Sequence, residues 1–190
     1  MFDSLSEHEK RAWAARAAAA ILVVAAVWWG ASLYGPWILD DAYIIFRYVR
    51  NLAEGNGLVY NQGAEVLGFS TPLYTLLLGV LRVVGLPIIP TALAVGALAG
   101  FLGLAMVLVI SAEMKAEPAG WLAAVLTPLH FFWVVLFVSG METMLYACVI
   151  LLTLWVSVTR PKWTGLCAGL AMWVRYDGLI VALVALGSVA

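Results

Sequence analysis

Residues 91–112 read TALAVGALAGFLGLAMVLVISA, a continuous apolar run without a charged side chain. A helix of this length, rising about 1.5 Å per residue, crosses the roughly 30 Å hydrocarbon core of a bilayer. Four further apolar runs occupy 17–35, 119–138, 141–158 and 163–190, and the last of them is broken at 175–178. We therefore expect an all-α fold, a polytopic transmembrane helical bundle.

The composition agrees with a membrane protein. Hydrophobic residues make up 65% of the chain and charged residues 11%, and the mean hydropathy is +1.02. Soluble domains carry roughly 45–50% apolar and about 25% charged residues, so this chain lacks the polar residues for an ordinary water-facing surface. The formal net charge of −1 offers no basic field for nucleic acid, which we exclude as a partner.

The N-terminal segment 1–16 is polar and carries Lys10, Arg11 and Arg16 ahead of the apolar run 17–35. A signal peptide has the same order of segments, but this run ends in large aromatic residues, among them Trp28 and Trp29, and not in small residues before a cleavage site. Aromatic residues at that position are typical of a membrane interface. We therefore predict an uncleaved first span with a cytoplasmic N-terminus in the cell membrane.

The apolar segment 73–86 is short, contains Arg82 and ends before Pro87, a pattern more typical of a re-entrant than of a spanning segment. If it spanned, Glu142 would lie on the cytoplasmic side. If it turns back, Glu142 shares the extracytoplasmic face with the polar loop 36–70, while Lys115, Arg160 and Lys162 lie inside. The second, multi-pass arrangement obeys the positive-inside rule, and we favour it.

Residues 40–54, DDAYIIFRYVRNLAE, predict an amphipathic helix lying in the membrane interface. At about 100° per residue, one arc is apolar and the opposite arc polar. Asp40 is placed to cap this helix and Gly55 to end it. The apolar arc holds Ala42, Ile45, Phe46, Val49, Leu52 and Ala53, and the polar arc holds Tyr43, Arg47, Arg50, Asn51 and Glu54.

The polar residues of this helix suit the transfer of a phosphate-linked group. A carboxylate such as Asp40 can act as general base toward a hydroxyl acceptor, and Arg47 and Arg50 can hold a phosphate. Tyr43 projects from the same side of the helix. The alternative interpretation is structural, with Asp40 a cap and Asp41 a complement to the helix dipole. Further along, Glu65 is either a loop acid or a binding residue.

Three stretches resemble one enzyme family. DDAYIIFRYVRNLAEGNGLVYNQGAEVLGFSTPLYTLLLG (40–79) resembles the first extracytoplasmic loop of bacterial GT-C glycosyltransferases, in particular of the arabinofuranosyltransferase-like group. SGMETMLYA (139–147) resembles that group's second acidic corner. WVRYDGLIVAL (173–183) resembles its charged turn, with Tyr176 where proline is more usual. The resemblance covers roughly 17–190, and the motifs stand in the family's order.

The resemblance implies an inverting membrane glycosyltransferase with a polyprenyl-phosphate sugar donor. The acceptor hydroxyl would belong to a glycan, a lipid or a protein, and the reaction would take place on the extracytoplasmic face among membrane lipids. By position, Asp40 and Asp41 match the acidic pair that contains the base, and Glu142 matches the acid at the second corner. Arg175 and Asp177 match the charged turn and would bind the donor. Mg²⁺ or Mn²⁺ bridging the acidic pair and the phosphate would suit this chemistry, although the spacing does not demand a metal.

We expect residues 1–16 to be a cytoplasmic segment and 17–190 to be a GT-C-like transmembrane module, the N-terminal part of a longer one. Two other classes of function remain open. One is a non-catalytic membrane scaffold or lipid-binding subunit built on the same module. The other is a transporter fragment, in which Glu142, Arg175 and Asp177 line a pathway. Ion pairs from Arg175 to Asp177 or to Glu142 would give these three residues a purely structural role.

Overall fold

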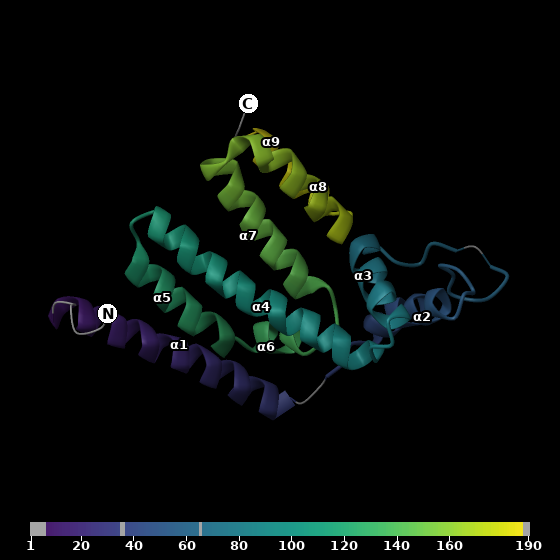
Figure 1. Cartoon of the computed structure of the whole chain (residues 1–190), viewed down its shortest axis with the longest axis horizontal. Helices are drawn as coiled ribbons and strands as arrows, with labels where there is room; N and C mark the ends of the chain where they lie inside the picture. Colours follow the sequence, from purple (N-terminus) through teal and green to yellow (C-terminus); the bar gives the residue numbers. More distant parts are fainter. Residues whose placement is uncertain (1–6, 35–36, 65, 188–190) are drawn as a thin grey trace.

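The computed structural model describes residues 7–34, 37–64 and 66–187. Within these ranges the regular structure is helical, apart from one isolated β-bridge between Asn61 and Ala64. The predicted all-α class is therefore confirmed (Figure 1). The elements are α1 (Glu7–Tyr34), α2 (Asp40–Ala53), α3 (Pro72–Val83), α4 (Ile88–Glu113), α5 (Glu117–Leu126), η2 (Thr127–Leu129), α6 (Phe131–Phe137), α7 (Thr143–Thr159), η3 (Pro161–Trp163), α8 (Thr164–Val174) and α9 (Gly178–Gly187).

One helix of the described chain, α4, is long and apolar enough to cross a membrane. A second span would be the pair formed by Glu117–Leu129 and Phe131–Phe137, which is bent by 72°. The predicted apolar segment 119–138 is thus interrupted, because η2 carries Pro128 and the chain turns at His130 before α6. The other apolar helices are shorter. One or two helices of the described chain are therefore long and apolar enough to span a membrane, and the polytopic bundle stays a prediction.

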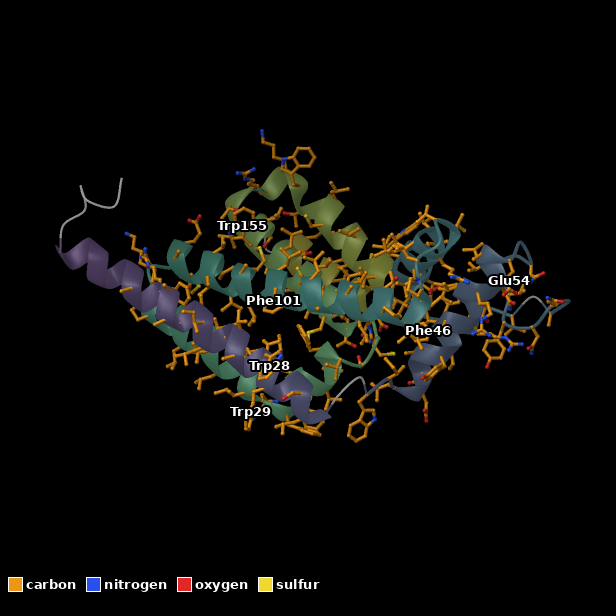
Figure 2. The ribbon with its side chains drawn as sticks, turned by 60° about the horizontal axis from the view of Figure 1, so that its bottom comes forward. Trp28, Trp29, Phe46, Glu54, Phe101 and Trp155 are labelled. Carbon is orange, nitrogen blue, oxygen red and sulfur yellow. The ribbon has the colours of Figure 1, made fainter. Side chains whose placement is uncertain are left out.

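The long helices pack side by side around α4 and α7 (Figure 1). The first helix, α1, lies along α5, and the α8–α9 hairpin packs on α7. Figure 2 places Phe101 among these helices, where its ring meets that of Phe137 edge to face with 5.7 Å between the ring centroids, a favourable arrangement for two aromatic rings. Apolar packing between helices therefore forms the body of the molecule.

The connections gather at two ends of this body. The α2–α3 region, the corner before α7 and the α8–α9 turn lie toward one end, while the α4–α5 and α7–α8 connections lie toward the other (Figure 1). With 12 residues, α3 is too short for a bilayer crossing of roughly 30 Å. Whether 73–86 turns back inside a membrane stays a prediction, as does the orientation of the molecule there.

The amphipathic helix is confirmed as α2, whose apolar face packs on α3 and on the start of α4. Gly55 ends it in the left-handed conformation (φ 81°), as predicted. The N-cap prediction was wrong: Leu39 occupies that position, and Asp40 is the first helical residue without a capping bond. Figure 2 shows Phe46 directed toward the helical body and Glu54 at the far end of α2.

Two residues outside the predicted apolar face of α2 are also buried, because they hold the following loop. Asn51 was predicted to face solvent, yet its Nδ2 donates to the carbonyl oxygens of Val59 (2.7 Å) and Tyr60 (2.9 Å). The Tyr48 hydroxyl donates to the Val66 carbonyl at 2.6 Å and accepts from the Gly68 amide at 2.8 Å. The helical period of the sequence predicts which face is apolar. It does not show that a polar side chain is buried because it bonds to a neighbouring loop.

Candidate functional site

A cleft of about 320 Å³ lies where α2, the segment before α3, the corner before α7 and the end of α8 come together. Volumes near this size are typical of small-molecule sites. Its lining combines a few charged and hydroxyl groups with apolar side chains. The lining residues are Asp41, Ile44, Ile45, Gly68, Phe69, Ser70, Thr71, Met141, Glu142 and Arg175.

The first turn of α2 supplies the carboxylate of the cleft. Asp41 shares a helix face with Ile44 and Ile45, three and four residues on, and all three line the cleft. Asp40 is one position and about 100° away and is not among the lining residues. The structure therefore separates the two members of the acidic pair and brings Asp41 to the cleft.

Two hydrogen bonds attach the α2–α3 region to the corner that precedes α7. The Leu39 amide donates to the Ser139 carbonyl at 3.2 Å, and the buried Tyr74 hydroxyl donates to the Gly140 carbonyl at 2.8 Å. Gly140 adopts φ 73° and lies close to Phe46, whose ring would be 3.2 Å from an added Cβ. This sharp corner places the following residues in the cleft wall opposite α2.

Glu142 is the most deeply buried acid of the cleft, with 1% of its surface exposed. Its Oε1 accepts a bond from Nη1 of Arg175 at 2.9 Å, and the same guanidinium donates from Nε to Oδ1 of Asp177 at 3.1 Å. The Arg175 guanidinium also lies over the Tyr146 ring, 5.5 Å from its centroid. The structure thus brings together the three charged residues of the two later motifs, with both of the ion pairs considered above.

Burial dominates the electrostatics of this cluster. It raises the pKa of Glu142, while the positive charge and hydrogen bond of Arg175 act in the opposite direction. Glu142 precedes α7 and lies outside α4 and the bent α5–α6 pair. The single cation Arg175 pairs with two acids, Glu142 and Asp177. The two carboxyl groups can therefore accept a hydrogen bond from a further donor.

Two buried polar atoms of the cleft residues have no partner in the described chain, Oε2 of Glu142 and Oγ1 of Thr71. Both residues are more than nine-tenths buried and both line the cleft. Buried polar atoms are nearly always hydrogen-bonded, so an acceptor and a hydroxyl left unpaired in one cleft suit a polar ligand. Thr71 lies within the loop motif 40–79, but the sequence pattern predicted no role for it.

Other predicted site residues lie away from this cleft. Arg47 donates from Nε to the Tyr60 carbonyl at 3.1 Å and stacks over the Tyr60 ring, so it stabilises the loop. Tyr43 and Arg50 line a separate groove. Glu65 lies outside the described residues. The four residues expected to act together, Asp40, Tyr43, Arg47 and Arg50, do share a side of α2, but the cleft forms on the side of Asp41.

A second hollow of about 310 Å³ adjoins the cleft and shares Ile44 and Gly68 with it. Its walls include the rings of Tyr48 and Tyr60 and the side chain of Asn61. The residues described contain no group of three or more His, Cys, Asp or Glu side chains arranged to hold a metal ion. A metal held by Asp40 and Asp41 together stays a prediction. Of these two residues, only Asp41 lines the cleft.

Comparison with known proteins gives one informative similarity. No family model and no solved structure matches the chain. The chain is 35% identical over 102 residues to the terminal beta-(1->2)-arabinofuranosyltransferase of Mycobacterium tuberculosis. The matched stretch is 53% of this chain and 16% of that protein, so the chain spans a small part of that relative's length. This similarity supports a glycosyltransferase relationship.

Proposed function

We propose that the chain carries the catalytic cleft of a membrane glycosyltransferase of GT-C type. Its donor would be a sugar linked to polyprenyl phosphate and its acceptor a hydroxyl group on the extracytoplasmic side. One observation carries the proposal: Asp41, Glu142 and Arg175 lie far apart in the sequence and line one cleft of about 320 Å³. The similarity to an arabinofuranosyltransferase supports the same class of reaction.

In the proposed reaction, Asp41 removes the proton of the acceptor hydroxyl as its oxygen attacks the anomeric carbon of the donor. The bond from that carbon to the phosphate oxygen breaks, and polyprenyl phosphate leaves with the electron pair. This single displacement inverts the anomeric centre. Arg175 meets the negative charge that develops on the leaving phosphate. A divalent ion would supply the same kind of charge stabilisation when bound. Asp41 is the predicted metal ligand that lines the cleft.

The roles of Glu142 and Thr71 follow from their unpaired atoms. Glu142 holds the Arg175 guanidinium with one oxygen and offers the other to a sugar hydroxyl, and the Thr71 hydroxyl adds a second polar contact. The adjoining hollow extends the cleft past Ile44 toward Tyr48 and Tyr60. Aromatic rings and an amide suit the apolar faces and hydroxyls of a second sugar, so we place a glycan acceptor there.

Donor binding is the first test. The chain, purified in detergent, would be titrated with a polyprenyl-phosphate sugar, and the Arg175→Gln variant compared with Arg160→Gln at the other end of the molecule. We expect Arg175→Gln to weaken binding at least about tenfold, because it loses a charge-assisted contact to phosphate. Arg160→Gln should bind as the wild type does. Equal binding by both variants would contradict the assignment, and absence of donor binding by the wild type would favour the scaffold alternative.

Sugar transfer is the second test and separates the two aspartates. We expect Asp41→Asn to bind the donor normally and to transfer sugar roughly 10²–10⁴-fold more slowly, the usual contribution of a general base. Asp40→Asn should retain most of the activity, because Asp40 does not line the cleft. The opposite ranking of the two variants would assign the base to Asp40.

A further inference from the structure

A second charged groove, of about 340 Å³, lies among α2, α3 and the start of α4 and shares no lining residue with the cleft. Two arginines, Arg50 in the last turn of α2 and Arg82 in the last turn of α3, enter it from different helices. The remaining lining is aromatic, aliphatic or proline. It comprises Tyr43, Phe46, Pro87, Ile88, Ile89 and Pro90.

The two arginines lack acidic partners. Neither makes an ion pair within 4.0 Å to a described carboxylate, whereas Arg16 and Arg175 both do. The protein hydrogen bond found for Arg82 is a long one, 3.5 Å from Nη1 to the Leu86 carbonyl. No Asp or Glu stands among the residues that line the groove. Both guanidinium groups are thus available to an external anion.

Backbone donors add to this positive field. The amide of Thr91 is the first in α4 to bond along the helix, to the Pro87 carbonyl at 3.1 Å. The amides of Ile88 and Ile89 precede it and have no carbonyl one turn back inside the helix. The N-terminus of this 26-residue helix therefore faces the same groove as the two arginines. The residues that line the groove thus supply positive charge and unpaired backbone donors, and none of these residues is a carboxylate.

The position of the groove indicates where the anion comes from. It lies where α4, the helix long and apolar enough to cross a membrane, begins. Tyr43 is half exposed at its edge, and Ile88 and Ile89 continue into the apolar surface of α4. A phosphate bound by Arg50 and Arg82 would sit at headgroup level, with its acyl chains free to run along α4. A free phosphate would gain nothing from those apolar walls.

We propose that this groove binds the phosphate of an anionic membrane lipid. The site is distinct from the donor cleft, and the inference does not rest on the proposed glycosyltransferase activity. It reassigns Arg50, which sequence reasoning had placed at the donor phosphate. It also gives a role to Arg82, which interrupts an otherwise apolar helix. Planar guanidinium groups from two helices can clamp one phosphate by paired hydrogen bonds.

The test measures lipid binding to the detergent-purified chain by native mass spectrometry. The wild type would be titrated with phosphatidylglycerol and with uncharged phosphatidylcholine, and phosphatidylglycerol binding repeated with excess inorganic phosphate. We expect phosphatidylglycerol to bind at least about tenfold more tightly, as two charge-assisted contacts predict. The double variant Arg50→Gln, Arg82→Gln should lose this preference. Arg50→Lys, Arg82→Lys should keep part of it, because the charge remains.

The matched control is Arg160→Gln, Lys162→Gln, which also removes two positive charges, from exposed positions in the α7–α8 connection. This connection lies at the other end of the molecule (Figure 1). The control variant should retain the wild-type preference. Loss of preference in this control, or its persistence in Arg50→Gln, Arg82→Gln, would overturn the proposal, as would equal binding of both lipids by the wild type. Displacement of phosphatidylglycerol by inorganic phosphate alone would keep the anion site but overturn the lipid as its ligand.

Discussion

At the scale of single residues, the most consequential group is the buried carboxylate of Glu142. It is 1% exposed, its cation Arg175 is one-third exposed, and one of its oxygens has no partner in the described chain. Removing the cation from such a pair is more damaging than replacing both members, because a lone charge then stays in an apolar environment. The pair therefore predicts a definite order of variant stabilities.

We expect Arg175→Leu to lower the free energy of unfolding by about 3 kcal/mol, since it leaves Glu142 buried without a cation. Glu142→Gln should cost less than about 1 kcal/mol, because its amide oxygen still accepts from Arg175. The double variant Arg175→Leu, Glu142→Leu should be more stable than Arg175→Leu alone. Denaturant unfolding in detergent measures all three, and an additive double variant would show that the ion pair does not couple the two residues.

The raised pKa of Glu142 predicts a pH dependence. A carboxyl group whose pKa is higher in the folded than in the unfolded protein favours folding while it is protonated, and this contribution is lost as pH rises through the folded pKa. The Glu142→Gln variant does not lose stability in this way, because glutamine does not titrate. We therefore expect the wild type to fall in melting temperature relative to Glu142→Gln as pH is raised from about 4.5, the ordinary carboxyl value. A relative gain with rising pH would contradict the raised pKa.

Sequence reasoning at this scale identified the charged residues but not their groupings. Glu142, Arg175 and Asp177 came from two separate motifs and form one cluster. Arg47 and Arg50 were predicted on one face of the helix, yet they have different neighbours. Arg47 bonds to the loop at Tyr60, whereas Arg50 lines a groove with residues of α3 and α4. A helical wheel gives the angle of a side chain but not the element that lies opposite.

At the scale of elements, the α8–α9 hairpin carries Arg175 into the cleft wall. The charged break that divides 163–190 was visible in the sequence, and the structure confirms it as the turn between two packed helices. Gly178 begins α9 so close to α8 that an added Cβ would lie 2.4 Å from the Ala171 carbonyl oxygen. Only glycine allows this approach.

We expect Gly178→Ala to destabilise the protein by roughly 1–3 kcal/mol, the usual cost of overpacking, and to weaken donor binding by displacing Arg175. Gly169→Ala in the middle of α8 is the matched control, because its added Cβ meets nothing within 4 Å. That variant should be neutral or stabilised by up to about 1 kcal/mol. Melting temperature and donor titration provide the measurements. Equal stabilities of the two variants would mean that the hairpin opens without cost.

The loop after α2 depends on Asn51, which bonds two of its carbonyl groups. We expect Asn51→Leu to loosen the loop after α2, because an apolar side chain leaves the Val59 carbonyl without its donor and the Tyr60 carbonyl with only the bond from Arg47. Limited proteolysis should then cut this loop several times faster than in the wild type. Asn56→Leu should be cut at the wild-type rate, because the Asn56 side chain is exposed and makes a long hydrogen bond of 3.4 Å to Glu54, while its backbone bond to the Asn51 carbonyl is kept. Equal protection in both variants would rule out this anchoring role.

At the scale of the whole molecule, the polar groups divide between two ends. The loop after α2 lies at one end, and the α4–α5 and α7–α8 connections lie at the other (Figure 1). The segments that line the cleft belong to the first end, and the two connections contain the exposed residues Lys115, Arg160 and Lys162. This division was predictable from the positive-inside rule together with the shortness of 73–86. The bend in 119–138 was not predicted, because the segment is apolar on both sides of Pro128 and His130 and membrane helices tolerate a proline.

We expect the two ends to face opposite sides of a membrane. Single cysteines introduced as Gln62→Cys and Lys162→Cys, in a background with Cys148→Ala and Cys167→Ala, should react with an impermeant maleimide from opposite sides of sealed vesicles. Both positions are exposed in the structure. Labelling of both from the same side would contradict the orientation and with it the extracytoplasmic location of the cleft.

The bonds from Leu39 and Tyr74 to the corner at Ser139 and Gly140 have a mechanical consequence. They join the start of α2 and the first turn of α3 to the corner before α7, although Tyr74 and Gly140 are 66 residues apart in the sequence and Leu39 and Ser139 are still further apart. Tilting α2 would carry Asp41 and Glu142 in the same direction and leave the separation of their backbones unchanged. Widening of the cleft around a bulky substrate therefore falls to the remaining walls, the segment 68–70 and the hairpin tip that holds Arg175.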